Sequence, residues 1–408
     1  MKENYLDKSI TSGQKVYLII AIMLVSTNLR PGITSVGPLL GIIREKLDLE
    51  NWSIGMFAAI PLITFAIMAP LTPKIAVRLG NIRTAFIGLV ILFVGISVRS
   101  VPLTTISFIG ASLIGLGIAI INVLLPAIIK SRFPQKIGQL TSLYSTIMLF
   151  FAALSSGFSL PLAQMGLGWE WSLFFWSVLA LIAIIALIPV YTLDDKVNDI
   201  NVQKDKNEKV GKVEKNNLLK SPLAWNVTLF MGLQSYCFFA FVSWLPEILQ
   251  SRGFSSITSG WLLSYSQFVG LFSTFLVPIV AGKYPNQQKI VGTVGLAFIL
   301  GVSGIILGKS KFILVIAVTF IGVSAAASIS LALVFFGMRT QNEQQASELS
   351  GMAQSIGYVF AALGPLVTGI LYDWFSSWEL PLTSIIIVII LMLITGLKSA
   401  ENKRINIS

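Results

Sequence analysis

Long apolar segments recur from one end of this chain to the other, and they constrain its fold more than any other feature. A helix needs ~20 residues to cross the hydrocarbon core of a bilayer. Because lipid offers no partner for a backbone N–H or C=O, every spanning segment of this kind must be helical. Only 12% of the residues are charged, against about 25% in soluble domains. The sequence therefore predicts an all-α integral membrane protein with twelve transmembrane helices, at about 16–43, 53–72, 84–100, 104–129, 138–164, 171–193, 222–250, 258–282, 290–308, 312–337, 347–371 and 380–397.

The positive charges follow the topology of these spans. The formal net charge is +11, which by itself would suggest a nucleic-acid partner. With the N-terminus inside, however, the cytoplasmic segments hold 22 of the 29 Lys and Arg residues and the outer loops hold six, among them Arg44, Arg99 and Arg252. This is the positive-inside distribution of membrane proteins. We therefore expect both termini in the cytoplasm of a cell, lipids around the chain and no nucleic-acid partner.

One long polar segment divides the chain. Residues 192–221 are rich in Lys, Asn and Asp and poor in large apolar residues, which is typical of a solvated linker. We expect an N-terminal six-helix bundle at 1–193, a cytoplasmic linker at 194–220 and a C-terminal six-helix bundle at 221–408.

The two halves resemble each other. Pro38 and Pro246 each close a first span, and Pro70 and Pro278 each close a second span; both pairs are 208 residues apart. The string FAAL occurs at Phe151 and again 209 residues later. A shared offset at equivalent spans indicates a parallel repeat, the plan of one major class of transporters, in which the binding site lies near the midplane between the halves.

Several longer strings resemble a known family. The twelve-span plan in two halves looks like the major facilitator superfamily, and within it the chain resembles the cyanate and 2-nitroimidazole permeases. This resemblance implies that spans one, four, seven and ten line a central cavity and that the solute is a small anion such as cyanate or a small polar heteroaromatic. The strings are NLRPGITSVGPLL at 28–40, INVLLPAIIKSRFP at 121–134, LAWNVTLFMGLQSYCFFAFVSWLPEIL at 223–249 and LSGMAQSIGYVFAALGPLVTGIL at 349–371.

The loop between spans two and three departs from the superfamily pattern. That pattern places an Asp shortly before Arg-x-Gly, where this chain has Val77, while Arg78, Gly80 and Arg83 are retained. The resemblance implies a gating role for these three residues, with contacts that differ from those made by the missing acid. The alternative is that the cations only mark the cytoplasmic side.

Arg30 is the clearest single candidate for function. It lies near the centre of the first span, where a cation costs on the order of 2.5–3.5 kcal/mol and usually faces a cavity or a partner. We interpret it as a contact for an anionic or electron-rich solute; the alternative is that backbone carbonyls freed at Pro31 and Gly32 satisfy it. Ser26 lies four residues before Arg30 and Thr34 lies four residues after it. A regular helix would place all three on one face, toward an aqueous cavity.

Further polar candidates lie on spans four and seven. Asn122 is the amide of span four, where it could bind a solute or join helices. On span seven, Gln234 and Tyr236 lie about 200° apart on a regular helix, so only one of them would face the cavity. Trp244, near the end of that span, is typical of an interfacial anchor.

Tyrosine and glutamine side chains on two other spans complete the candidate site. Tyr144 lies in span five, and Gln354 and Tyr358 lie four residues apart in span eleven. We include all three among the residues that could contact a solute.

The sequence also restricts the chemistry. It has no His and one Cys, so we expect no metal site and no cofactor, and it lacks the Lys motif of a nucleotide-binding loop. No acid lies near the middle of a predicted span, so proton coupling through a buried side chain is not supported. Glu247, near the outer end of span seven, is the exception to be tested.

Together these features predict a secondary carrier that moves a small solute by alternating access, as a monomer. A membrane sensor built on the same scaffold is the alternative, although it would need a signalling domain. A membrane enzyme would need a nucleophile–base pair or a metal cluster at membrane depth, so we do not expect one.

Overall fold

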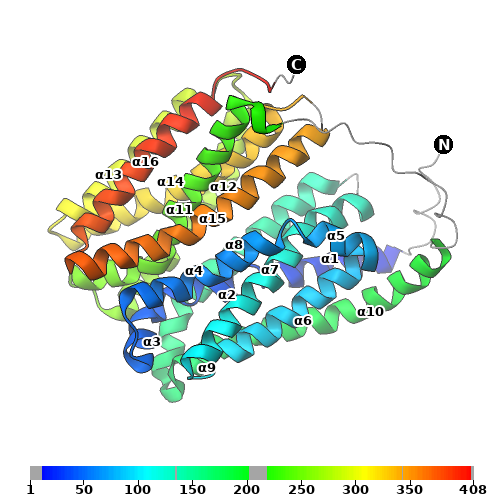
Figure 1. The fold of residues 1–408 in the computed structure, drawn as a ribbon, viewed down its shortest axis with the longest axis horizontal. Coiled ribbons are helices and arrows are strands. Elements are labelled where there is room, and N and C mark those ends of the chain that lie inside the picture. The colour runs from blue at the N-terminus through cyan, green and yellow to red at the C-terminus, as the bar shows by residue number, and fades with distance from the viewer. Residues whose placement is uncertain (1–11, 134–135, 202–217, 342, 406–408) are drawn as a thin grey trace.

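The computed structural model describes residues 12–133, 136–201, 218–341 and 343–405, and it is helical throughout this part of the chain. Figure 1 shows the helices running side by side as an elongated bundle, with α1 beginning and α16 ending at the same end of the molecule. The N-terminal half contains α1 Ser12–Ser26, α2 Pro31–Thr34, α3 Leu40–Leu47, α4 Asn51–Met68, α5 Thr72–Leu79, α6 Asn81–Arg99, α7 Thr104–Arg132, α8 Ile137–Leu162, α9 Gly168–Phe175 and α10 Ser177–Asn201. The C-terminal half contains α11 Pro222–Ser251, α12 Ser256–Gly282, α13 Gln288–Leu307, α14 Lys311–Met338, α15 Glu343–Phe375 and α16 Glu379–Ser399.

The prediction of twelve transmembrane helices is confirmed. Within the described residues, twelve helical segments are long and apolar enough to cross a membrane. The last helix of the first half, α10, continues to Asn201, beyond the boundary predicted at 193. Most of the predicted linker, residues 202–217, lies outside the described residues.

The first span, predicted at 16–43, is present as Gly13–Leu47, but it is interrupted and is not one regular helix. Helix α1 ends at Ser26, a turn follows over 27–30, and the chain then forms α2, a 3₁₀ turn at Gly37–Leu39 and α3. Pro31 has no N–H, and its ring would clash with the carbonyl of Thr27 in a regular helix. The Asn28 amide donates to the carbonyls of Leu24 (3.1 Å) and Leu179 (3.2 Å), which fastens the turn to α10.

Arg99 supports the same interruption from α6. We expected this residue in an outer loop, but its side chain is 1% exposed and its Nη1 donates to the carbonyl oxygen of Gly32. Backbone groups freed inside a membrane must find partners. Arg99 therefore provides a hydrogen bond that the broken helix cannot provide for itself.

The contacts between the halves occur in two equivalent sets, as a pseudo-twofold axis requires. Helix α4 packs on α15, and α8 packs on α12. With the offset of 208–209 residues seen in the sequence, α4 corresponds to α12 and α8 corresponds to α15. Each contact is therefore the repeat of the other.

Tight helix crossings occur between equivalent pairs of helices in the two halves, α4 with α7 and α12 with α14. Gly115 of α7 lies against the carbonyl of Pro61 on α4, and Gly322 of α14 lies against the carbonyl of Ser266 on α12. A Cβ at either glycine would overlap the facing carbonyl oxygen. Small residues permit this approach between membrane helices, where close packing is a main source of association.

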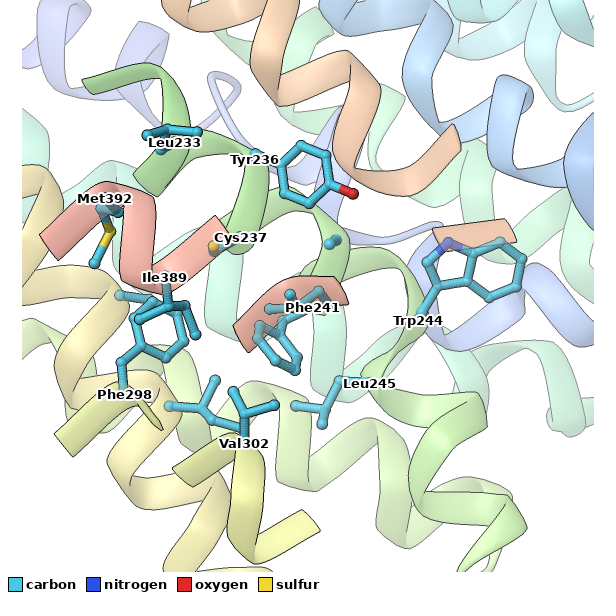
Figure 2. Close-up of a cluster of buried hydrophobic side chains, with 14 of the residues drawn as sticks. Leu233, Tyr236, Cys237, Phe241, Trp244, Leu245, Phe298, Val302, Ile389 and Met392 are labelled. Carbon is cyan, nitrogen blue, oxygen red and sulfur yellow. The ribbon is translucent and has the colours of Figure 1, made fainter. Parts of the chain in front are cut away.

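The seventh span is the centre of the C-terminal core. Figure 2 shows Tyr236, Cys237, Phe241 and Trp244 of α11 packed among side chains of neighbouring helices. Trp244 was predicted to anchor the span at the membrane surface, and this was wrong. Its ring is 0% exposed, and its Nε1 donates to the carbonyl of Pro365 at 2.8 Å.

We predict that Gly115→Ala and Gly322→Ala each destabilise the protein, because the added methyl forces the crossing helices apart. Overpacking of this kind costs about 1–3 kcal/mol. Thermal unfolding of the purified protein measures the effect. Gly337→Ala is the matched control, since nothing lies within 4 Å of a Cβ at that position on α14. Equal melting temperatures for all three variants would contradict the tight crossings.

Candidate solute-binding site

Arg30 lies between the two halves of the molecule. It is the last residue of the turn before α2, and its guanidinium carbon lies 5.3 Å from the ring centroid of Phe238 and 5.5 Å from that of Phe239, both on α11. A cation over an aromatic face is attracted by the quadrupole of the ring. The offset of 208 residues makes Phe238 the repeat equivalent of Arg30. Equivalent positions can meet only near the pseudo-twofold axis, so Arg30 is central.

The guanidinium of Arg30 has neither a hydrogen bond nor an ion pair with any residue that the structure describes, although Arg30 is only 7% exposed. The alternative from the sequence was that carbonyls freed at Pro31 and Gly32 satisfy it. The Gly32 carbonyl instead accepts from Arg99, and that of Pro31 accepts from the Ser35 N–H. A buried cation without an anion is costly, so this position favours an anionic or electron-rich guest.

Tyr358 of α15 is the predicted tyrosine that lies near this cation, and Tyr144 of α8 in turn lies near Tyr358. The Tyr358 ring stacks on Phe65 of α4, with centroids 3.6 Å apart and 23° between the planes. Arg30, Tyr144 and Tyr358 therefore form one cluster, which is built from both halves.

A cavity opens next to Arg30. It contains about 560 Å³ of space between atoms, a volume that includes its open mouth. Its wall comes mainly from α11, α12 and α14 and is largely apolar. The polar side chains in the wall are Arg30, Ser266, Gln267 and Thr274. This combination of an apolar surface with a few polar groups is typical of a small-molecule site.

Gln267 is a lining residue that the sequence analysis missed. It lies on α12, is 8% exposed, and its Nε2 donates to Ser156 Oγ of α8 at 2.6 Å. An amide in the middle of an apolar span was the signal available for it, the same signal that drew attention to Gln234. Span eight was not among the spans that the resemblance assigned to the cavity.

Arg30 is the one predicted solute-binding residue in the cavity wall: Tyr144 and Tyr358 do not line it, and four other candidates also lie outside it. The Gln234 amide donates to Ser235 Oγ at 2.7 Å, and the Gln354 amide donates to Ser350 Oγ at 2.8 Å. Tyr236 belongs to the C-terminal core (Figure 2), and Asn122 is half-buried on α7. The structure does not bring these four residues to the cavity around Arg30, and their contact with a solute stays a prediction.

The polar face expected on the first span is not continuous. Ser26 donates to the Ile22 carbonyl at 2.7 Å, and the Thr34 hydroxyl lies 2.6 Å from Ser155 Oγ on α8. Both side chains are fully buried. The expectation of one polar stripe toward the cavity was wrong because the turn at 27–30 breaks the helical spacing, and Arg30 alone of the three lines the cavity.

The predicted gating residues surround the start of α6. Gly80 has φ = +88°, a backbone conformation that favours glycine. Arg83 lies over the ring of Tyr191 at 5.8 Å, and Arg78 is exposed on α5. Val77, at the position of the missing acid, is 87% exposed.

Polar contacts also join the halves at the end of the molecule opposite the start of α1 and the end of α16. We call this the distal end. Arg44 of α3 contacts Glu247 of α11 at 3.4 Å. Asp373 of α15 accepts from the Asn51 amide at 2.6 Å and from the Trp52 backbone N–H at 2.6 Å. Asp373 thus caps the N-terminus of α4, a helix of the other half, where a carboxylate is favourable.

Comparison with known proteins places this geometry in a family. Residues 18–362 match the Major Facilitator Superfamily, and the chain belongs to it. A transporter of Bacillus subtilis (strain 168), described as the uncharacterized transporter YycB, is 43% identical over 96% of this chain and 95% of its own. The 2-nitroimidazole transporter of Escherichia coli (strain K12) is 34% identical over 97% of this chain and 98% of its own.

A solved structure shares the fold. It is a bacterial homolog of the human lysosomal transporter Spinster, which superposes with a TM-score of 0.74 over 95% of this chain and 97% of that chain, at 14% identity. The family match and the sequence relatives confirm, at the level of the family, the resemblance to the 2-nitroimidazole and cyanate permeases. The protein is a multi-pass membrane transporter.

We predict that Asp373→Ala loosens the distal end, because it removes the cap of α4. Loss of a cap costs about 1 kcal/mol. The ratio of molecules with separated distal ends to molecules with joined ends should therefore rise roughly fivefold. Spin labels at Glu45→Cys and Ser251→Cys, on a Cys237→Ala background, measure the separation. Glu379→Ala, an acid in the first turn of α16, is the control. An unchanged distance distribution in Asp373→Ala would show that this contact does not hold the halves together.

Proposed function

We propose that this transporter is a secondary carrier that moves a small anionic or polar heteroaromatic solute, similar to cyanate or a nitroimidazole, by alternating access. The observation that carries the proposal is the Arg30 guanidinium, which lies between the halves, lines the cavity and has no hydrogen-bond or ion-pair partner among the described residues. A guanidinium pairs with anions, donates to planar acceptors such as a nitro group and stacks on rings.

The surroundings of Arg30 support a flat or aromatic guest. Phe238 and Phe239 flank its guanidinium, and Tyr358 and Tyr144 extend the aromatic cluster. Aromatic faces bind planar solutes through offset stacking. The 2-nitroimidazole transporter of E. coli, at 34% identity, supports a nitro-substituted azole. In this proposal Tyr144 and Tyr358 orient the solute.

Movement of the two halves about Arg30 would supply alternating access. The distal contacts of Arg44 and Asp373 would break when the cavity opens at that end, which the distribution of Lys and Arg assigns to the outside. The protein would then lie in the cell membrane with cytoplasmic termini, and Arg78, Gly80 and Arg83 would act at the opposite gate. Asn122, Gln354 and either Gln234 or Tyr236 would contact the solute only in another conformation of the carrier.

We predict that Arg30→Ala removes most solute binding. Hydrogen bonds to a charged group contribute about 1.5–3 kcal/mol, so binding should weaken roughly ten- to hundredfold. Arg30→Lys should lie between wild type and Arg30→Ala, since it keeps the charge and loses the planar fork. Both variants should still insert, because neither adds an insertion cost.

Uptake of radiolabelled cyanate and 2-nitroimidazole into proteoliposomes, with binding to the purified protein, measures the effect. Arg252→Ala, at the distal end of α11, is the control. If Arg30→Ala transports normally, the site is misassigned. If wild type binds a probe and moves none, the sensor alternative is favoured.

We also predict that transport does not depend on a proton carried by a side chain. No carboxylate lines the cavity, and Glu247, the candidate acid, lies at the distal end against Arg44. Uptake of a permanently neutral nitroimidazole should therefore continue in the presence of a protonophore and in Glu247→Gln, as facilitated diffusion or exchange. Loss of accumulation in both conditions would identify Glu247 as the proton carrier.

A further inference from the structure

A residue of the cavity wall, Gln267 of α12, has a buried hydrogen-bond acceptor without a donor. Gln267 lines the same cavity as Arg30, and its Oε1 is buried without a hydrogen-bond partner. Arg30 can only donate hydrogen bonds, whereas an amide oxygen can only accept them. The two residues therefore offer opposite chemistry to the same guest.

The neighbours of Gln267 fix the orientation of its amide. Ser156 Oγ lies 3.2 Å from the Thr34 carbonyl and 3.1 Å from the Ala152 carbonyl, and its proton is donated toward them. A hydroxyl has one proton, and with that proton on a carbonyl the oxygen of Ser156 accepts from Gln267. The Nε2 of Gln267 donates to it at 2.6 Å, which leaves the carbonyl oxygen of the amide unpaired.

The other hydroxyls in the wall are already engaged. Ser266 donates to the Leu263 carbonyl at 2.7 Å, and Thr274 donates to the Gly270 carbonyl at 3.2 Å. Neither has a proton left for Gln267 Oε1. A buried acceptor that stays unpaired is costly, and a donor on the bound solute would remove that cost.

We infer that Gln267 is a specificity-determining residue, which accepts a hydrogen bond from an N–H or O–H group of the solute whose anionic or electron-rich end lies at Arg30. This inference rests on the proposed function and narrows it. The site then selects small planar solutes that carry both an acceptor group and a donor, such as a nitroazole with a free ring N–H. Cyanate carries no donor and would leave Gln267 unpaired.

The donor requirement can be measured with wild-type protein alone. The probes are 2-nitroimidazole, 1-methyl-2-nitroimidazole, which lacks the N–H, and 4-methyl-2-nitroimidazole, which keeps the N–H and adds the same methyl. Binding to the full-length protein is measured in mildly acidic buffer, where the ring N–H stays protonated. We expect the 1-methyl compound to bind about tenfold more weakly than the other two, which is ~1.4 kcal/mol.

Gln267→Leu should remove this preference. Binding of 2-nitroimidazole should fall about tenfold while that of 1-methyl-2-nitroimidazole stays the same. Gln288→Leu is the matched control, since it makes the same change at a half-buried, hydrogen-bonded glutamine of α13 far from the cavity. A thermal unfolding curve for each variant shows that the protein is folded.

The outcomes separate this inference from the proposed function. Arg30→Lys should weaken all three probes by the same factor. If wild type binds all three probes equally and Arg30→Lys still weakens them, the proposed function stands and the role of Gln267 is refuted. An equal loss for all probes in Gln267→Leu would make the residue structural and also refute it. If wild type binds none of the probes, or if Arg30→Lys has no effect, both proposals fail.

Discussion

The break in the first span is the feature on which the site depends. In a bilayer, each backbone group released from a helix must be paired again, so a break persists only where protein surrounds it. Here Asn28, which donates to the Leu24 carbonyl, and Arg99, which donates to the Gly32 carbonyl from α6, supply part of that pairing. The turn delivers Arg30 to the interface between the halves, where its guanidinium meets Phe238 and Phe239. A continuous helix would have carried Ser26 and Thr34 toward the cavity with it.

The two halves are alike in packing and different in chemistry. The contact of α4 with α15 repeats that of α8 with α12, and the tight crossings at Gly115 and Gly322 lie between equivalent pairs of helices. At the axis, however, one half contributes a cation and the other contributes an aromatic ring at the equivalent position. Backbone spacing is therefore shared between the repeats, whereas the residues that face the cavity have diverged.

Sequence reasoning predicted the helices well because lipid leaves only one way to pair the backbone. The spans and the repeat followed from hydropathy and spacing, and its charge within an apolar span singled out Arg30, whose role stays a prediction. The wrong predictions have a common origin. They arose because regular helices were assumed and because residues near span ends were assigned to the surface. Pro31 breaks the first span, which redirects Ser26 and Thr34, while Arg99 and Trp244 turn inward to carbonyl partners. Gln267 was missed because its place in the cavity wall and its hydrogen bond to Ser156, on a helix of the other half, depend on how the helices pack.

Because Asp373 caps α4 from the other half, loss of this helix cap is linked to separation of the two halves, two processes that are usually independent. A helix cap normally belongs to its own chain segment, so it persists whatever the domains around it do. Here the cap comes from the opposite half, at 2.6 Å from the Trp52 N–H. Separation of the distal ends therefore also exposes the free N–H groups at the start of α4, a point of partial positive charge. Water or a dissolved anion must then replace the carboxylate, so the ionic composition of the distal solution bears on how readily the two halves part.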